Sequence, residues 1–395
     1  MHDGSAFYDP YSREVFDDPY PVYKSLRDEA PLYRDPSARW WVLSRFDDVW
    51  SAVRDYATFS SRLGPDPANL DDNGRKYSII SMDPPRHDRV RSILNRSFTP
   101  DRVAAQERQV REIVEGYFDR LEPGTRVDAM TAFAGPIPSD VIGALLDLPA
   151  ADRPYLRELW DLYLAREEGV FGLPRAAIDA SRKISEYISG IIEERRARPG
   201  SDLISTVLHA EYRDEHGEVT RLDDHDVLMF CNLLSAAGSE TTQKLIGNAL
   251  AALSEHRDEW RRIVADPSLI PTAVDEALRY DTPSHYIART TTRDVALHGG
   301  VIPAGDWVLL LLGAANRDDR EYPDPDAFRA DREFDRSVFF GWGRHVCLGQ
   351  WLARLETQIV LEMMATRFPD FEAGERTRIL TSTVRGFDRL ELELR

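Results

Sequence analysis

Apolar and charged residues are spaced along most of the chain as in helices rather than strands. In residues 101–120 and 176–198 the apolar positions recur every three or four residues beside charged faces, which predicts amphipathic helices. The second pattern stops at Pro199-Gly200, a dipeptide that ends helices. Residues 270–280 predict a further helix with Pro271 in its first turn, where the missing N–H needs no partner.

The longest predicted helix covers residues 223–253. Asp223 is suited to cap its N-terminus, with Asp226 three residues later as a partner. A helix of this length runs roughly 45 Å, enough to cross the whole molecule. Its middle, from Leu234 to Ala237, is apolar on nearly every side, so we expect the helix to be buried.

Strand signals are few and short. They fall at Trp40 to Leu43, Val301-Ile302, Trp307 to Leu309 and Leu390 to Leu394. The sequence therefore predicts a mainly α protein with small β-sheets. Proline and glycine are scattered, and no repeat or linker divides the chain, so we expect residues 1–395 to form a single domain.

The composition indicates a globular protein with a large core. Apolar residues make up 42% of the chain and charged residues 30%, which excludes a mainly disordered chain. The longest nearly uninterrupted apolar run, Val308 to Ala315, is too short to span a bilayer. The N-terminus lacks the basic and apolar regions of a secretory signal. We therefore expect a cytoplasmic protein without a membrane anchor.

Charge and cysteine content argue against three further classes of protein. The formal net charge of −18 argues against nucleic acid as a partner. Two cysteines, Cys231 and Cys347, do not make a disulfide framework, and they rule out a four-cysteine zinc site.

The segment that carries the chemistry is Phe339-Phe340-Gly341-Trp342-Gly343-Arg344-His345-Val346-Cys347-Leu348-Gly349, which leads into a predicted helix at Gln350. Backbone N–H groups and a helix N-terminus favour an anion at Cys347, so we expect a lowered thiol pKa. Four interpretations of this segment compete: a buried structural cysteine, a phosphatase-like nucleophile, a dinucleotide loop and a thiolate ligand to iron. Val346 weakens both the phosphatase and the dinucleotide interpretation, because those motifs need histidine or glycine there.

The order of residues from Phe340 to Gly349, followed by Leu352-Ala353-Arg354, resembles the haem-binding signature of the cytochrome P450 family, bacterial soluble class. Other segments match that family in order and spacing. They are Glu276-x-x-Arg279, Ala237 to Thr242, His87-x-x-x-Arg91, Ala315 to Asp318 and Phe328 to Arg332.

The resemblance implies one triangular, mainly α domain with haem b between two central helices. It makes Cys347 the only protein ligand to the iron. It places Phe340, Gly341, Gly349 and Ala237 against the haem, and it assigns the haem carboxylates to His87, Arg91, Arg289 and His345. It also implies that Glu276, Arg279 and Arg332 form a buried structural cluster.

The motif around Gly238 is unusual for the middle of a buried helix. Glycine and threonine are poor helix formers, and a buried Glu240 is costly unless it is paired. A local kink with a satisfied polar group is one interpretation. The resemblance implies another: Gly238 lets the helix pass close to the haem, Thr241 holds the oxygen ligand and relays protons, and Glu240 supplies them. Thr242 and Cys231 are expected to be structural.

The resemblance further implies a haem-thiolate monooxygenase that uses dioxygen to hydroxylate or epoxidise its substrate. No flavin or iron–sulfur segment is left over, so electrons from NAD(P)H would arrive through a ferredoxin and its reductase. A basic patch for docking is expected from five arginines at 86, 89, 91, 96 and 102, with Arg344. We expect a monomer. A peroxide-dependent peroxygenase and a non-catalytic haem protein that binds a ligand remain as alternatives.

By the same resemblance, the pocket walls come from the loop before Ser81, residues 160–175, the middle of the long helix, and two turns near residues 284–287 and 383. The predicted apolar contacts are Leu233, Leu234 and Ile287, and the predicted polar contacts are Ser284, His285, Tyr286 and Thr383. Such walls suit a lipophilic molecule of medium or large size with a polar handle, such as a terpenoid, steroid or polyketide. The competing interpretation is that His285 and Tyr286 point away into structural hydrogen bonds.

Overall fold

The structure is a computed structural model that describes residues 8–68, 78–168, 170–214, 216–381 and 383–395. The helices are α1 Arg13–Asp17, α2 Tyr20–Glu29, α3 Phe46–Arg54, α4 Arg86–Asn95, α5 Pro100–Ala104, α6 Glu107–Phe118, α7 Pro136–Leu145, α8 Arg153–Leu164, α9 Arg175–Ala197, α10 Leu203–His209, α11 Asp224–Glu255, α12 Arg257–Ala265, α13 Ile270–Tyr280, α14 Leu312–Ala315 and α15 Gln350–Arg367. The strands are β1 Leu32–Arg34, β2 Trp41–Leu43, β3 Phe59–Ser60, β4 Arg126–Asp128, β5 Glu211–Arg213, β6 Val219–Arg221, β7 Ile287–Thr291, β8 Val295–Leu297, β9 Gly300–Ile302, β10 Trp307–Leu310, β11 Phe371–Thr377 and β12 Arg389–Leu394.

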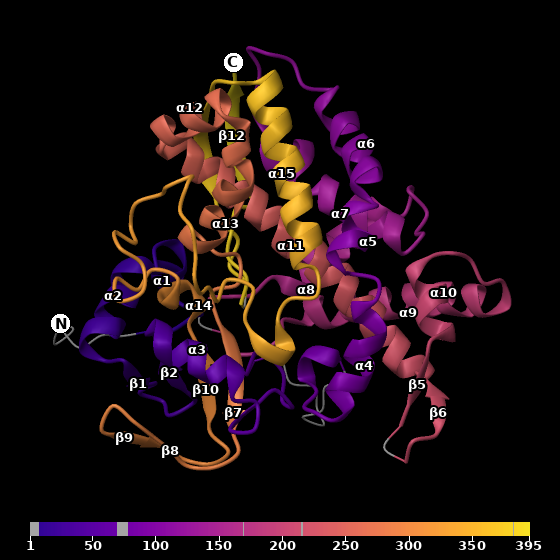
Figure 1. Ribbon diagram of the computed structural model, residues 1–395, viewed down its shortest axis with the longest axis vertical. Helices are drawn as coiled ribbons and strands as arrows, with labels where there is room; N and C mark the ends of the chain where they lie inside the picture. The colour runs from indigo at the N-terminus through magenta and orange to yellow at the C-terminus, as the bar shows by residue number, and fades with distance from the viewer. Residues whose placement is uncertain (1–7, 69–77, 169, 215, 382) are drawn as a thin grey trace.

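The prediction of a mainly α fold with small sheets is confirmed (Figure 1). Three of the predicted helices correspond to α9, α11 and α13 within two residues, because their periodicity and stop signals are clear. The single helix predicted for residues 101–120 is wrong, since α5 ends at Ala104 and α6 begins at Glu107. None of the helices among the described residues has the length and apolar character needed to cross a membrane.

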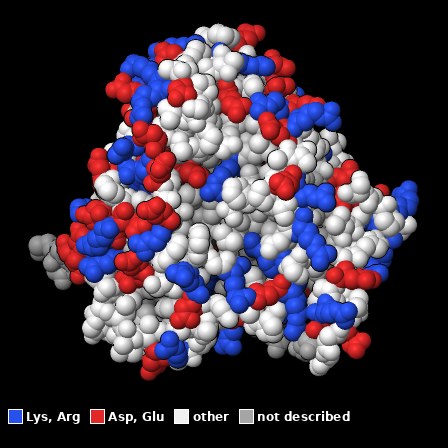
Figure 2. All heavy atoms as spheres, viewed as in Figure 1, with Lys and Arg blue, Asp and Glu red and all other residues white. Residues whose placement is uncertain are grey.

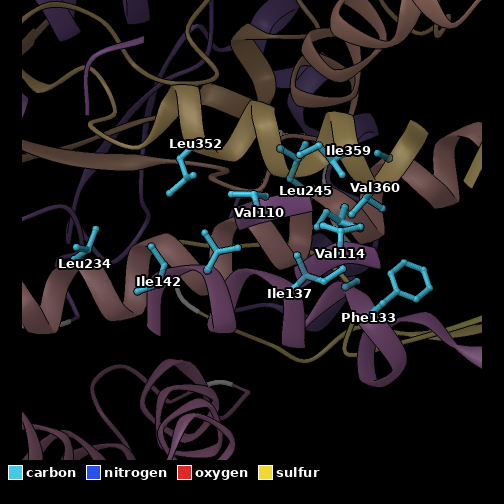
Figure 3. Close-up of a cluster of buried hydrophobic side chains, with 14 of the residues drawn as sticks. Val110, Val114, Phe133, Ile137, Ile142, Leu234, Leu245, Leu352, Ile359 and Val360 are labelled. Carbon is cyan, nitrogen blue, oxygen red and sulfur yellow. The ribbon is translucent and has the colours of Figure 1, made fainter. Parts of the chain in front are cut away.

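Helix α11 is the central element of the fold. Its N-terminus is capped as predicted, because the Asp223 side chain accepts a hydrogen bond of 2.7 Å from the backbone N–H of Asp226. Helices α7, α9, α13 and α15 all pack against α11. Figure 3 shows side chains of α15, among them Leu352 and Val360, facing the core that contains Leu245 of α11.

The glycine in the middle of α11 has a packing role. A Cβ atom at Gly238 would lie 2.5 Å from Cδ1 of Ile142, which projects from α7. A larger side chain at this position would therefore require Ile142 to move where α7 and α11 cross. This helix–helix contact is a second reason for glycine at this position, beside the predicted close approach of the helix to haem, and α11 continues without interruption from Asp224 to Glu255.

The largest sheet brings distant segments together beside this helical core. Its strand order is β1-β2-β10-β7-β3, with β2 and β10 parallel and the other pairs antiparallel. A second sheet has the order β11-β12-β4, and two hairpins, β5-β6 and β8-β9, complete the strands. The first sheet fixes the position of Arg289, which lies opposite Val308 in the β7-β10 register.

A buried ion cluster joins α13 to the segment that precedes the Cys347 loop. Two nitrogens of Arg279 donate to the two oxygens of Glu276, at 2.7 and 2.9 Å, and neither residue is exposed to solvent. Nε of Arg332 donates to the same carboxylate at 3.2 Å, as does the backbone N–H of Arg329 at 2.8 Å. The predicted cluster of Glu276, Arg279 and Arg332 is confirmed.

Removal of the charge from this cluster should destabilise the protein strongly. In Glu276→Gln, two buried guanidinium groups lose their counter-ion, so we expect the free energy of unfolding to fall by about 3–5 kcal/mol. Asp17→Asn is the control, because it breaks an ion pair of 2.8 Å with Arg13 whose two side chains are 49% and 41% exposed. Such a pair contributes under about 1 kcal/mol. Urea unfolding would measure both variants, and equal small losses would contradict the structural role.

Candidate functional site

The Cys347 loop, residues 339–349, is a tight turn that ends at the N-terminus of α15. The backbone N–H of Cys347 donates to the carbonyl oxygen of Phe340 at 2.9 Å, which closes the turn. Gly341 and Gly343 have φ angles of 66° and 71°, in the left-handed region where a side chain is strained. The motif needs glycine at both positions because of this backbone geometry.

Contrary to the sequence-based expectation, the pKa of the Cys347 thiol is raised. Burial is the largest cause, because it removes water from the thiolate. The backbone N–H of Gly349 and the charges of Arg91 and Arg354 lower the pKa, as expected for a helix N-terminus, but they do not outweigh burial. A cation bound to the sulfur would supply the charge that stabilises the thiolate.

The ring of Phe340 is held in place from α15. The guanidinium carbon of Arg354 lies 4.6 Å from the centre of the Phe340 ring. Nε of Arg354 also donates to Asp275 on α13 at 2.7 Å. The helix that carries Glu276 is thus tied to the Cys347 loop by a second contact.

Four basic side chains meet beside this loop: His87, Arg91, Arg289 and His345. The ring centres of His87 and His345 are 4.2 Å apart. Nη2 of Arg91 donates to the carbonyl oxygen of Val346 at 2.6 Å, and Arg91 lies close enough to Cys347 to feel its charge. The charge of Arg289 lowers the pKa of His345, which places it near the same group. We call these four residues the basic cradle.

The basic cradle has unused hydrogen-bonding capacity. Nε2 of His87 and Nε2 of His345 are buried and have no hydrogen-bond partner among the described residues. Among the described residues, no carboxylate forms an ion pair with Arg91 or Arg289. Burial lowers the pKa of both guanidinium groups, that of Arg289 to about 10, and it outweighs the charge of Asp83, which acts on Arg289 in the opposite direction. A ligand with carboxylate groups would satisfy these donors.

One face of α11 borders accessible space. Leu233, Ala237 and Thr241 are spaced four residues apart and therefore share a face, and all three retain accessible surface although most of the helix is buried. The Thr241 hydroxyl donates to the carbonyl oxygen of Ala237 at 2.5 Å. Leu234, by contrast, is 8% exposed and belongs to the core cluster seen in Figure 3.

The side chain of Glu240 forms its hydrogen bond and its ion pair with other residues than Thr241 does. Its Oε1 lies 3.2 Å from Nζ of Lys244, and its Oε2 accepts a hydrogen bond of 3.2 Å from Nε2 of Gln243. Lys244 in turn donates to the carbonyl oxygen of Phe387 at 2.8 Å. The buried carboxylate is therefore paired, as the cost of burial requires.

The predicted wall residues divide into two groups. Ser284, Ile287 and Thr383 are half-buried, and the backbone contact between His285 and Thr383, 2.9 Å from N to O, joins the two turns that carry them. The predicted loop before Ser81 consists largely of residues 69–77, which lie outside the described residues.

His285 and Tyr286 make structural contacts instead. Nδ1 of His285 lies 2.9 Å from the Tyr23 hydroxyl, and the hydroxyls of Tyr286 and Tyr11 are 3.5 Å apart. The two side chains are 6% and 1% exposed, in contact with aromatic residues of the N-terminal segment. We therefore remove both from the candidate wall.

The predicted basic patch is smaller than expected. Arg86 donates to Asp226 at 2.6 Å, Arg344 pairs with Asp88, and Arg91 belongs to the basic cradle. Arg96 and Arg102 are exposed. Figure 2 shows basic and acidic side chains interleaved over the face that carries α15 and the Cys347 loop, with basic groups gathered near the loop.

Comparisons with known proteins agree with this arrangement. A family model described as Cytochrome P450 matches residues 172–384. The putative cytochrome P450 123 of Mycobacterium tuberculosis is 40% identical over 392 residues, which cover 98% of this chain and 96% of the relative. The chain belongs to the cytochrome P450 family. It is accordingly an oxidoreductase of the monooxygenase class.

Solved cytochrome P450 structures share the fold. CYP109E1 from Bacillus megaterium in complex with testosterone has a TM-score of 0.86 and 30% identity, and the match covers 96% of this chain and 98% of that one. The cytochrome P450 PksS of the bacillaene polyketide synthase of Bacillus subtilis has a TM-score of 0.88 and 30% identity, covering 98% of this chain and 100% of that one.

Membership of the cytochrome P450 family implies a haem-thiolate iron cofactor. The residues at the site fit that group. The Cys347 thiol would supply the soft ligand to iron, and the two buried imidazole nitrogens that lack partners, together with the two guanidinium groups, would bind the two carboxylates of haem.

Three residues near the site were missed in the sequence. Lys244 and Gln243 could have been found, because positions three and four residues after Glu240 face it on a helix. Burial and the neighbouring charge of Glu240 raise the pKa of Asp161 on α8, and no spacing in the sequence connects these two residues. Cys231 is fully buried, as expected for a core residue.

The structural role of His285 gives a pH dependence that can be measured. Burial lowers its pKa to about 4, whereas the unfolded chain has a value of about 6.5. The folded state thus favours the neutral ring. Its contribution to stability, about 3 kcal/mol, is complete above about pH 6.5 and is lost as the pH falls toward 4.

His285→Gln should therefore make the free energy of unfolding less dependent on pH between pH 4 and pH 6.5. It should leave substrate binding unchanged. Tyr286→Phe is the control, because tyrosine does not titrate in that range. Denaturant unfolding and substrate-induced spectral titration would measure the two effects. A weakened substrate affinity in both variants would return these residues to the pocket.

Proposed function

We propose that this cytochrome P450 uses dioxygen and electrons from NAD(P)H to oxygenate a lipophilic small molecule of medium or large size. The observation that carries the proposal is the convergence of the Cys347 loop with the basic cradle. The accessible face of α11 that contains Thr241 also supports it.

In this proposal Cys347 binds the iron through its sulfur. His87, Arg91, Arg289 and His345 hold the haem carboxylates by charge-assisted hydrogen bonds. Phe340, Gly341, Gly349 and Ala237 would line the site that holds the macrocycle. When bound, the haem supplies the reductive activation of dioxygen, and the remaining work of the chain is to orient substrate and deliver protons.

Thr241 and Glu240 divide the delivery of protons. The Thr241 hydroxyl lies on the accessible face of α11 and is positioned by its hydrogen bond to the Ala237 carbonyl. Glu240 is buried next to it along the chain and is held by Lys244 and Gln243. A hydroxyl on the accessible face and a buried carboxylate at the preceding residue would suit stepwise transfer of protons during the reduction of dioxygen.

The substrate pocket, in this proposal, is lined by Leu233 and Ile287 as apolar groups and by Ser284 and Thr383 as hydrogen-bonding groups. All four retain accessible surface. The similarity to CYP109E1 in complex with testosterone and to PksS of a polyketide synthase favours a steroid-like or polyketide-like substrate. An apolar pocket with a few polar groups recognises such a molecule by shape and by its oxygen substituents.

Electrons would arrive from a ferredoxin and its reductase at the face that carries the Cys347 loop. Trp342 and Trp351 are 45% and 42% exposed there. Arg96 and Arg102 are exposed nearby in the chain segment around α5. Aromatic anchors with a basic rim suit an acidic protein partner.

The thiolate assignment has a spectroscopic test. Cys347→Ser should abolish the red-shifted Soret band of the reduced carbon monoxide complex, because that shift depends on a sulfur ligand. Cys231→Ser should keep it, since Cys231 is fully buried in the core and its pKa is raised to about 12 by burial. A retained band in the Cys347 variant would overturn the assignment.

Thr241→Ala should leave haem and substrate binding intact, because neither requires the hydroxyl. We expect the product formed per NADPH consumed to fall about tenfold or more, with hydrogen peroxide released instead, since general acid–base groups typically contribute at least that much. Thr242→Ala is the matched control. The assay uses a surrogate ferredoxin and reductase, and unchanged yields in Thr241→Ala would mean that another group carries the protons.

A further inference from the structure

A second pocket, of about 320 Å³, lies at the C-terminal end of α11, where α1, α13 and β11 meet that helix. Sites for small molecules typically range from about 300 to 1,000 Å³. None of the described residues that line this pocket belongs to the basic cradle or to the Cys347 loop. Ala251, which lines it, follows Thr241 by ten residues on α11, or about 15 Å along the helix axis. The pocket is therefore separate from the candidate haem site.

The floor of this pocket is apolar. Ala251 and Ala252 of α11 and the ring of Phe387 line it, and all three residues are buried. The two alanines end at Cβ, so successive positions of the helix leave the floor without long side chains. Apolar groups of a ligand would lose contact with water there, which favours binding.

The rim of the pocket carries charged side chains that pair with one another. Arg13 lies 2.8 Å from Asp17 on α1, and Nη2 of Arg376 lies 2.6 Å from Glu255. All four side chains are exposed, so these pairs are weakly held. Neither pair leaves an excess charge.

Arg378, between rim and floor, has no carboxylate of its own. Its Nη2 lies 3.2 Å from Oδ2 of Asp281, and its Nη1 donates to Oδ1 of Asn248 at 3.4 Å. Asp281 is also bound by Nη1 of Arg385 at 2.5 Å and by the Tyr20 hydroxyl at 2.7 Å. One carboxylate thus serves two guanidinium groups, and the shorter contact is with Arg385.

The pocket therefore has one positive charge in excess. In the ion pairs just described, four guanidinium groups share three carboxylates. Burial is the largest cause that lowers the pKa of Arg378; the charge of Asp281 opposes it, and that of Arg385 adds to it. A guanidinium has five N–H donors, and Arg378 donates two hydrogen bonds among the described residues. An additional anion would meet both the charge and the unused donors.

We propose that this pocket binds a small organic anion, a carboxylate with an apolar body. The carboxylate pairs with Arg378, and the apolar body covers Ala251 and Ala252. The guanidinium carbon of Arg378 lies 3.8 Å from the centre of the Phe387 ring, so stacking holds the group in place for charge-assisted hydrogen bonds. This inference does not depend on the proposed function, because the pocket shares no residue with the haem site.

The first test is calorimetric titration of the haem-loaded protein with 2-naphthoate. Saturating 4-phenylimidazole, which coordinates the haem iron, keeps the probe out of the substrate pocket. The wild type should bind one equivalent of 2-naphthoate. The neutral analogue 2-naphthamide should bind about tenfold or more weakly, because it lacks the charge that pairs with Arg378. Absence of 2-naphthoate binding, or equal affinity for the two compounds, would overturn the proposal.

The second test removes the cation. Arg378→Gln should weaken the binding of 2-naphthoate about tenfold or more. Arg389→Gln is the matched control, because it removes the same charge opposite Thr377 in the β11-β12 register, from a residue that does not line the pocket. The control should bind 2-naphthoate as the wild type does. An unchanged affinity in Arg378→Gln would contradict the assignment of the anion to Arg378.

A third variant keeps Arg378 and fills the floor, so it decides the matter if Arg378→Gln does not fold. Ala252→Leu should weaken the binding of 2-naphthoate about tenfold or more, because the longer side chain occupies the space of the apolar body. The spectrum of the reduced carbon monoxide complex should stay unchanged. Wild-type affinity in Ala252→Leu would overturn the proposal. Formation of oxygenated product without any binding of 2-naphthoate would reject this pocket and leave the proposed function standing.

Discussion

The site depends on buried basic groups of which two, Arg91 and Arg289, form no ion pair among the described residues. Arg91 and Arg289 lose water on burial, which lowers the pKa of both guanidinium groups. Two buried imidazole nitrogens beside them lack partners among the described residues. Such an arrangement is costly in a folded protein unless an anionic ligand completes it. A cofactor with two carboxylates would remove this cost when it binds, so these basic groups favour its binding.

Contacts elsewhere in the structure hold the basic cradle, the Cys347 loop and α11 in position. The buried Glu276 cluster fixes the segment that leads to the Cys347 loop, and the contacts of Arg354 tie the loop itself to α13. The sheet register holds Arg289 opposite β10. The close crossing of α7 and α11 at Gly238 sets the position of the helix whose accessible face contains Thr241. The contacts that stabilise the fold therefore also position Cys347, Arg289 and Thr241.

Local patterns in the sequence predicted the parts of this site that are local in the chain. The glycines of the Cys347 loop are required by their own backbone angles, and the length of α11 follows from its cap and its apolar middle. The pKa of the Cys347 thiol could not be predicted in this way, because burial by distant segments outweighs the helix N-terminus.

The directions of side chains that contact distant segments could not be predicted from the sequence either. His285 and Tyr286 turn toward aromatic residues near the N-terminus, and periodicity around residue 285 carries no information about them. Asp161 lies near enough to Glu240 to be affected by its charge only because α8 packs against α11. Conversely, the contact of Glu240 with Lys244 follows from helix geometry alone.

The central claim is that the basic cradle and Cys347 together form the haem site. The most direct measurement is the crystal structure of the haem-loaded protein. The account predicts iron bonded to Sγ of Cys347, with the two haem carboxylates hydrogen-bonded to His87, Arg91, Arg289 and His345. A histidine nitrogen on the iron, or carboxylates in solvent while the four basic side chains keep their present contacts, would contradict it.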